Sequence, residues 1–353
     1  MFKNGCFYPF LMLNNHSQKY LEVISREVSL EELSHNINNL RANLTRNGKT
    51  GLVQKLFDFT ENQSLPPLNR RAITELLINY FSSNNSYGQM AKLANSLING
   101  VRNYHQENRN LDDYVEGATV SFRRLRPPEN RIEELVDLMR MQNQRIWDYY
   151  GFKNKKNRTI FGQSLLVLGC YGNLEDIPLI LEFIEKDKTT FGEYDPMEKI
   201  MNLKDGRIED SSPILGRNNR FLDYTLSSLQ KILSRNADNV GKRNSEEVRR
   251  VCGNLLKDFT NPDLISGLGP FHYSSSTLRT LSARLDSQDL LLGLKYVQSS
   301  GDEALAENML RAINDSRESL NYMGKKDLLL KREPKIREIC GELKRLIKNP
   351  SQN

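Results

Sequence analysis

Apolar residues recur every three or four positions along much of the chain, in runs that come in pairs separated by short polar turns. The clearest pair spans Leu165–Asp187, where two apolar stripes meet at Gly169 and Gly172 and Pro178 lies in the second. Spacing of three and four places side chains on one face of an α-helix. The stretch predicts two helices in which the glycines turn the chain through positive φ. Pro178 is expected in the first turn of the second helix, where a missing amide costs no hydrogen bond.

Looser versions of this two-helix unit occur before it. Ser29 followed by Glu32 forms a capping box and predicts a helix that begins at once, and Asn69 is placed to cap another. Taking Asn69, Leu111 and Asn157 as the starts of successive pairs, the intervals are 42 and 46 residues. That period is typical of two-helix solenoid repeats.

The unit at residues 158–187 resembles a HEAT-type repeat, a helix pair with a glycine turn followed by an acidic residue and a proline. The residues that carry the resemblance are Leu168, Gly169, Gly172, Asp176, Ile177, Pro178, Leu181 and Ile184. The resemblance implies an all-α fold, a right-handed α-solenoid of antiparallel helix pairs. The alternative is an irregular helical bundle with one glycine-linked hairpin.

The periodicity also suggests how the chain is divided. It fades over 191–219, where Gly, Pro, Asp and Ser accumulate, although Asp195–Pro196 predicts one short helix there. We therefore expect a helical-repeat region at 1–190, an irregular linker or insertion at 191–219, and a second helical-repeat region at 220–353. A helix with Pro334 in its first turn is expected to cap the end. No alternating apolar run is bounded by hairpin turns, so strands are not predicted.

Cysteine usage and hydropathy bear on the cell compartment. The four cysteines are far apart and have no paired spacing, which argues against a zinc site and a disulfide framework: Cys6, Cys170, Cys252 and Cys340. No run approaches the roughly 18 apolar residues that a membrane-spanning helix needs. We expect a cytoplasmic protein with reduced, mostly buried thiols and no membrane span.

No catalytic or cofactor signature is found. The histidines are isolated from one another, and HExxH, phosphate-loop and GxSxG patterns are absent. His272 lies beside a serine run, but adjacent residues rarely place a nucleophile and its base in hydrogen-bonding geometry. The sequence predicts that Ser275 or Ser276 caps a helix and that His272 packs in the turn. A non-catalytic protein without metal or cofactor is expected.

Charge is the more informative feature. The net charge of +6 is concentrated in two segments: 120–160 has ten basic against five acidic residues, and 324–348 has nine against four. In the first segment basic residues are mixed with aromatic side chains, which can stack on bases. The candidate binding residues are Arg123, Arg124, Arg126, Lys153, Lys155, Lys156 and Arg158. In the opposing interpretation they decorate a solvated helix face.

Two functions follow from these observations. The leading hypothesis is an interaction protein, or scaffold, that binds a protein or peptide partner along a concave surface made by the second helices of its pairs. The alternative is nucleic-acid binding through the basic segments 120–160 and 324–348. Helical-repeat DNA glycosylases resemble this architecture and carry basic concave surfaces, which implies a DNA-repair role by analogy. No catalytic acid is identified for such a role.

Overall fold

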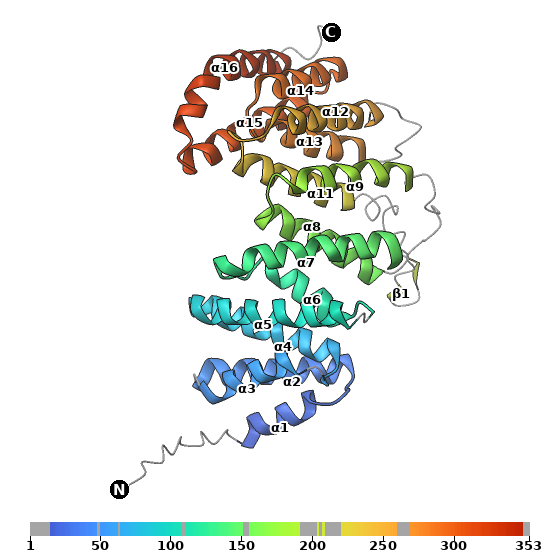
Figure 1. Ribbon diagram of the computed structural model, residues 1–353, viewed down its shortest axis with the longest axis vertical. Coiled ribbons are helices and arrows are strands. Elements are labelled where there is room, and N and C mark those ends of the chain that lie inside the picture. The colour runs from blue at the N-terminus through green and yellow to red at the C-terminus, as the bar shows by residue number, and fades with distance from the viewer. Residues whose placement is uncertain are drawn as a thin grey trace. The chain divides into compact units, whose positions relative to one another are not determined.

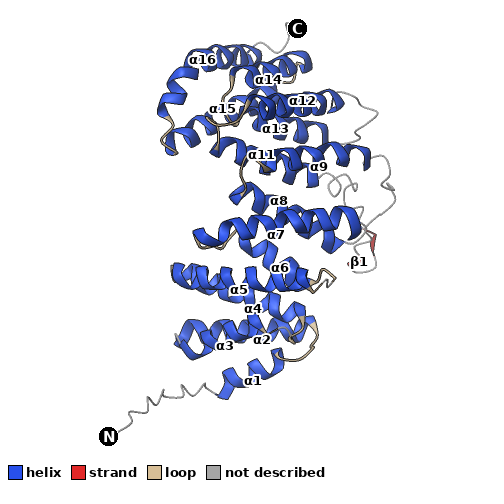
Figure 2. Ribbon diagram, viewed as in Figure 1, coloured by secondary structure: helices blue, strands red, loops and turns tan. Residues whose placement is uncertain are grey.

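Helices make up almost all of the structure, as predicted, and the fold is all-α (Figure 2). The computed structural model describes residues 15–47, 50–62, 64–107, 110–150, 155–190, 203–204, 207–208, 220–259 and 269–348. The described residues also include a short antiparallel pair of strands, β1 (Leu203–Lys204) and β2 (Arg207–Ile208). The rest of the predicted insertion, including the helix expected at Asp195–Pro196, lies outside the described residues.

The chain divides into two compact units, Met1–Ser164 and Leu165–Asn353. The division falls within α8 (Lys155–Tyr171), ahead of the predicted insertion. The helices of unit 1 are α1 (Asn15–Ile24), α2 (Leu30–Asn47), α3 (Thr50–Glu61), α4 (Pro67–Ser83), α5 (Tyr87–Gln106), α6 (Asp113–Phe122), a 3-10 turn (Glu129–Arg131), α7 (Ile132–Arg145) and a π-helical turn (Ile146–Tyr150).

Helices of unit 1 follow one another in chain order (Figure 1). α3 packs on α4, α4 on α5 and α5 on α6, and four helices also contact the helix two places further on: α2 with α4, α3 with α5, α4 with α6, and α5 with α7. The buried stripes are leucine, isoleucine, valine and phenylalanine at the spacing expected for helices. Each core layer is therefore shared by successive helix pairs.

Unit 2 contains the remaining helices: α9 (Asp176–Thr190), α11 (Arg220–Arg235), α12 (Lys242–Phe259), α13 (Gly269–Ser282), α14 (Ser287–Ser300), α15 (Glu303–Tyr322) and α16 (Lys326–Lys348). The same contact pattern recurs here, with α9 on α11, α11 on α13, α13 on α15, and α14 on α16. α16 also packs along α15 and closes the unit.

The glycine pair at the end of α8 has a different role from the one predicted. Gly169 lies inside α8, and neither Gly169 nor Gly172 has positive φ, so that prediction was wrong. A Cβ atom at Gly169 would lie 2.8 Å from the Cα of Ser228, and one at Gly172 would lie 2.5 Å from Asp176 Oδ2. Both positions need glycine because other atoms approach closely. Pro178 does lie in the first turn of α9, as predicted.

Two predicted helix caps had different outcomes. The backbone amide of Glu32 donates to Ser29 Oγ at 3.2 Å, which confirms the cap of α2. Asn69 is not a cap, because α4 begins two residues earlier. Its buried amide instead donates to the carbonyl oxygens of Ile24 (2.9 Å) and Arg26 (2.8 Å), the free acceptors at the end of α1.

The prediction for Pro334 was also wrong. It lies inside α16 rather than in a first turn, because α16 already begins at Lys326. The preceding helix, α15, ends at Tyr322, and the φ of 75° at Gly324 turns the chain so that α16 starts two residues later. The described cysteines form no disulfide, and Cys252 and Cys340 are buried.

Candidate functional site

Three exposed arginines at the end of α6 form a feature that we call the arginine ridge: Arg123, Arg124 and Arg126. Leu125 between them is 1% exposed and anchors the turn, which directs its neighbours outward. Pro127 follows, and a residue before proline is disfavoured in helical geometry, so α6 cannot continue. Cations at a helix C-terminus are also favoured by the helix dipole. The local sequence therefore holds three cations at one helix end.

Each guanidinium of the ridge contacts an uncharged group. The contacts are Arg123 Nη1 donating to Gln163 Oε1 (3.3 Å), Arg124 Nη2 donating to Asn79 Oδ1 (2.7 Å), and Arg126 placed 5.1 Å from the centre of the Tyr87 ring. None of the three has a carboxylate partner among the residues that the structure describes. A guanidinium has five N–H donors, so each keeps donors for an external acceptor. The ridge is positively charged, and its side chains are oriented by neutral neighbours.

The other predicted site residues do not join the ridge in the structure. Lys156 Nζ lies 3.2 Å from Asp113 Oδ1 at the start of α6, whereas the ridge is at its end. Ten helical residues separate these ends by about 15 Å. Arg158 is half-buried in α8, the side chain of Lys155 is not described, and Lys153 lies outside the described residues. Of the predicted site residues, Arg123, Arg124 and Arg126 share the turn after α6 and are exposed there.

The aromatic residues of this segment divide in the same way. The ring of Trp147 packs 5.8 Å from that of Phe161, so it belongs in part to the core. Tyr149 is 82% exposed. Phe152 and the side chain of Tyr150 lie outside the described residues.

A pocket of about 340 Å³ between α2 and α4 shares a wall with the ridge; we call it the α2–α4 pocket. Its lining residues are Arg41, Leu44, Thr45, Leu76, Asn79, Tyr80, Ser83 and Asn84. Asn79, which lines the pocket, also accepts the hydrogen bond from Arg124. The lining contains one cation and no carboxylate, so an anion entering the pocket meets no opposing charge from its walls.

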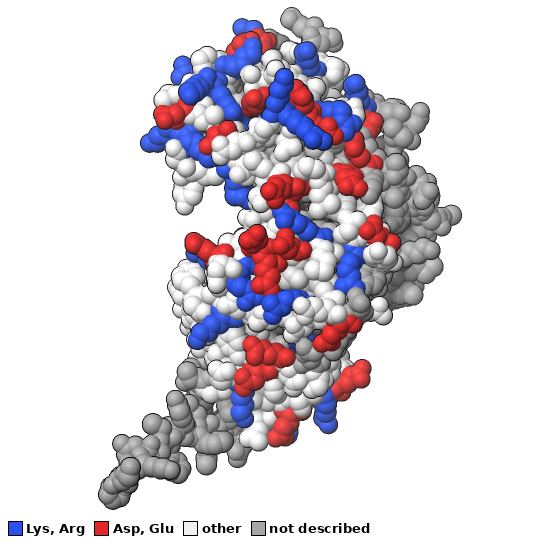
Figure 3. Space-filling view, viewed as in Figure 1, with Lys and Arg blue, Asp and Glu red and all other residues white. Residues whose placement is uncertain are grey.

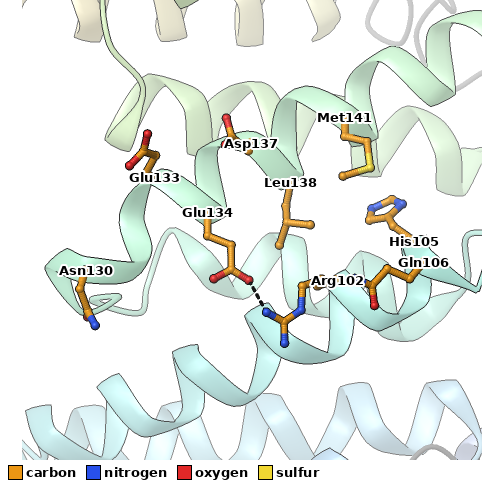
Figure 4. A pocket seen from close by; sticks show the side chains of 9 residues that line it. All are labelled: Arg102, His105, Gln106, Asn130, Glu133, Glu134, Asp137, Leu138 and Met141. Carbon is orange, nitrogen blue, oxygen red and sulfur yellow. Dashed lines mark hydrogen bonds and ion pairs between the residues drawn. The ribbon is translucent and has the colours of Figure 1, made fainter.

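A second, wider depression of about 600 Å³ lies between α5 and α7, and we call it the α5–α7 groove (Figure 4). Its lining residues are Arg102, His105, Gln106, Asn130, Glu133, Glu134, Asp137, Leu138 and Met141. Glu134 points toward Arg102, and their side chains are 3.1 Å apart. Glu133 and Asp137 project from α7 on the side away from Arg102. Met141 is 42% exposed, so the groove combines apolar surface with acidic side chains.

The buried wall of this groove is a hydrogen-bonded network around His105. Gln142 donates through Nε2 to Thr119 Oγ1 (3.1 Å) and Ser164 Oγ (2.5 Å), which leaves its Oε1 as an acceptor. His105 Nε2 therefore donates to Gln142 Oε1 at 3.3 Å, and Nδ1 accepts from Arg145 at 3.0 Å. Burial, aided by the charge of Arg145, lowers the pKa of His105, against the opposing effect of Gln142. The imidazole is neutral and structural. No sequence signal marks this network, because its hydrogen-bonded partners are 22 to 40 residues apart in the chain.

Arginines in unit 2 are used differently, because they donate to main-chain carbonyls at helix ends. Arg235 binds Gly169 O and Gly172 O (2.6 Å for the second), and Arg332 binds Arg284 O and Ala237 O (3.3 Å for the second). These carbonyls have no partner within their own helices. Arg332 therefore ties α16 to two turns that precede it by 48 and 95 residues.

Arg284, whose carbonyl oxygen contacts Arg332, belongs to a buried ion cluster. Arg284 contacts Asp289, and their side chains are 5% and 2% exposed. Arg249 Nε also lies 2.9 Å from Asp289 Oδ1, while Arg284 Nη1 donates to Ser245 Oγ at 2.7 Å. The cluster joins α12 to the α13–α14 turn and to the start of α14.

Several basic side chains of the segment 324–348 contact acceptors within unit 2. Lys325 contacts Asp238 and donates to Arg235 O at 2.7 Å. Others form ion pairs with carboxylates: Lys335 with Glu338, Arg337 with Glu333, and Arg345 with Glu342. On the face drawn in Figure 3, basic and acidic side chains are interspersed over this region.

Comparisons with known proteins identify no relative. No protein-family model, no curated protein and no solved structure matches the chain. In the part of the chain that is described, no three His, Cys, Asp or Glu side chains are grouped so that they could hold a metal ion. None of the described helices has the length and apolar character needed to cross a membrane.

Proposed function

We propose that the chain is a non-catalytic, cytoplasmic interaction protein, a right-handed HEAT-like α-solenoid that binds a protein or peptide partner on its helical-repeat surface. The observation that supports this most is the α5–α7 groove. α5 and α7 are the second helices of the pairs α4–α5 and α6–α7, and stacked pairs present such helices along one surface. The pairs that start with α4, α6 and α8 begin at Pro67, Asp113 and Lys155, 46 and 42 residues apart.

The groove favours a peptide that carries basic residues beside an apolar one. The exposed Met141 offers apolar surface beside the buried Leu138, and methionine adapts its shape to different partners. Glu133 and Asp137 are exposed, and complementary charges steer and orient a partner more than they add to affinity. An apolar anchor would occupy the groove, and lysine or arginine beside it would face Glu133, while Asp137 already contacts Arg140 Nη1 at 2.9 Å.

Selection from a displayed peptide library, followed by calorimetry on the selected peptides, tests this function. Met141→Glu should weaken binding about 10-fold or more, since a buried apolar anchor contributes on the order of 1–3 kcal/mol. Leu30→Glu is the matched control, because Leu30 is 69% exposed and far from the groove in sequence. Equal binding by Met141→Glu and wild type would contradict the groove as the site. Turnover of a small molecule by the purified chain would overturn the non-catalytic proposal.

A second candidate function is nucleic-acid binding, and the specific observation in its favour is the ridge, whose three guanidiniums face only neutral partners. Phosphate contacts made by such cations release counterions, so affinity should fall steeply as salt rises. Replacement of Arg123, Arg124 and Arg126 by alanine should weaken binding and flatten that salt dependence.

The control for the second candidate removes the same charge elsewhere. Lys331, Lys344 and Lys348 are exposed on α16, and replacing them by alanine also lowers the net charge by three. Fluorescence anisotropy with single- and double-stranded DNA and RNA from about 20 to 200 mM salt measures both variants. The candidate is contradicted if no nucleic acid binds at low salt, or if both variants lose the same affinity.

A further inference from the structure

We propose that the α2–α4 pocket and the arginine ridge together form a site for a short stretch of single-stranded nucleic acid. One unstacked base enters the pocket beside Tyr80, and the phosphates on either side lie against Arg41 and Arg124. This inference rests on the second candidate function. It adds that the nucleic acid is single-stranded, that one base has its own subsite, and that Arg41 and Tyr80, which lie outside the basic segments, take part.

The size and lining of the pocket fit a single planar base. Its volume of about 340 Å³ is at the small end of ligand sites, which are typically about 300–1,000 Å³. Leu44 and Leu76, each 1% exposed, form an apolar floor. Tyr80 is half-buried and supplies an aromatic ring to the lining. Stacking on an aromatic ring is the usual way in which single-strand binders hold a base.

Polar atoms around the pocket keep hydrogen-bonding capacity for the edge of a base. Asn84 donates through Nδ2 to Tyr80 O (2.7 Å), which leaves its Oδ1 as an acceptor. The hydroxyls of Thr45 and Ser83 donate to the carbonyls four residues before them, so their oxygen lone pairs remain. Asn79 accepts from Arg124 through Oδ1 and keeps its Nδ2 donors. Donors and acceptors are both present, which suits bases of more than one kind.

Two arginines flank the pocket. Arg41 lines it from α2, is exposed, and has no carboxylate partner among the described residues. Arg124 is attached to the opposite helix through Asn79, which lines the pocket from α4. Guanidinium groups bind phosphate oxygens through paired N–H donors. A phosphate on each side of the base would therefore meet a cation whose charge the protein has not already neutralised.

The arrangement favours single-stranded nucleic acid over a duplex or a phosphopeptide. A base can enter a pocket only when it is unstacked and unpaired, which excludes the interior of a duplex. A phosphopeptide presents one or two anionic groups, whereas the ridge continues past Arg124 to Arg126 and Arg123. Three exposed cations, none with a carboxylate partner among the described residues, suit the repeated charges of a nucleic-acid backbone better than a single phosphate.

The test compares four labelled probes by fluorescence anisotropy at about 50 mM salt. They are a single-stranded 12-nucleotide DNA, the same strand with abasic sites, the corresponding duplex, and a phosphopeptide. Tyr80→Ala should weaken binding of the single strand about 10-fold, since stacking of one base contributes on the order of 1–3 kcal/mol. It should leave binding of the abasic strand unchanged. Tyr80→Phe retains the ring and should bind as wild type does, which separates loss of stacking from loss of folding.

Arg41→Ala tests the phosphate contact, and its matched control is Lys55→Ala, an exposed lysine on α3 that also has no carboxylate partner among the described residues. Arg41→Ala should weaken binding of the single strand several-fold and lower the salt dependence of that affinity. Lys55→Ala should change neither. If duplex binds as tightly as single strand, or Tyr80→Ala weakens the abasic strand equally, the pocket inference is overturned while ridge binding stands. If no nucleic acid binds, the pocket inference and the nucleic-acid function of the ridge are both contradicted. Binding of the phosphopeptide alone, dependent on Arg41, would also overturn the inference.

Discussion

The ridge and α16 belong to two segments with the same excess of basic residues, five in each, yet the structure uses their cations in different ways. In the ridge, guanidiniums are exposed and contact an amide or an aromatic ring. In α16, Arg332 donates to main-chain carbonyls, and several other cations are paired with carboxylates. The charge of a segment therefore does not reveal its role. What separates the two regions is the acceptor that each cation contacts.

The cause of the difference is the supply of free acceptors. The turns after α11 and α13 leave carbonyls without intrahelical partners, and Arg332 reaches Ala237 O and Arg284 O there. At the end of α6 the chain turns through Leu125 and Pro127, and Arg124 instead finds the side chain of Asn79. Arg332 therefore contacts main-chain carbonyls, whereas the arginines of the ridge contact uncharged side chains.

The largest effect that would sharpen this contrast is expected at Arg284. Arg284→Met leaves the buried Asp289 with Arg249 alone, and breaking a buried ion pair by removing one partner costs about 3–5 kcal/mol. Urea unfolding monitored by circular dichroism measures the loss. Arg279→Met is the matched control on α13, the helix that precedes Arg284, and because Arg279 is exposed it should change the free energy of unfolding by less than about 0.5 kcal/mol. Similar changes in the free energy of unfolding for both variants would show that the buried Arg284 contributes no more to stability than the exposed Arg279.

Arg332→Ala should produce the next largest effect. It removes two charge-assisted hydrogen bonds to carbonyls at helix ends, for an expected loss of about 2 kcal/mol in the free energy of unfolding. Lys331→Ala, one residue earlier on α16 and exposed, should have almost no effect. If the two variants are equally stable, the hydrogen bonds of Arg332 do not stabilise the fold. The cations of α16 would then be as dispensable for folding as we expect those of the ridge to be.

An intermediate effect is expected from His105, which is hydrogen-bonded to Arg145 of the basic segment 120–160. Because the pKa of His105 is lowered in the folded state, the unfolded chain binds a proton first as the pH falls below 6.5. The folded state is thereby destabilised on acidification, by at most about 1.4 kcal/mol between pH 6.5 and 5.5. Urea unfolding at pH 7.5 and 5.5 should show this loss in wild type and a smaller one in His105→Gln. Equal losses would mean that His105 titrates normally.

Much of the fold could be predicted because its signals are local. Apolar spacing identified the helix pairs, and Ser29 with Glu32 identified one cap from four adjacent residues. The failures concern residues whose partners are distant in sequence. Asn69 binds carbonyls 45 and 43 residues away, and Gly169 is required by the approach of Ser228. A sequence shows that a residue is unusual, and packing decides what it does.

The candidate sites show the same limit. Charge counting found the arginines of the ridge, since they are adjacent in the chain. It also grouped them with Lys156, which the structure places at the other end of α6 in an ion pair with Asp113. The α2–α4 pocket gave no sequence signal, because Arg41 and Tyr80 lie on different helices of ordinary composition. Pairing of helices creates that surface, so only the structure reveals it.

The smallest effect on stability is expected at the ridge itself. Replacing Arg123, Arg124 and Arg126 by alanine removes contacts of exposed side chains with neutral groups, which contribute little, so the free energy of unfolding should change by less than about 1 kcal/mol in total. The same urea titration measures it beside Arg284→Met and Arg332→Ala. A loss of several kcal/mol would place the ridge with the structural arginines and remove the reason for assigning it a ligand. A near-zero change means that these three cations are dispensable for folding, and any weaker binding of a ligand by this variant then reports on contact with that ligand.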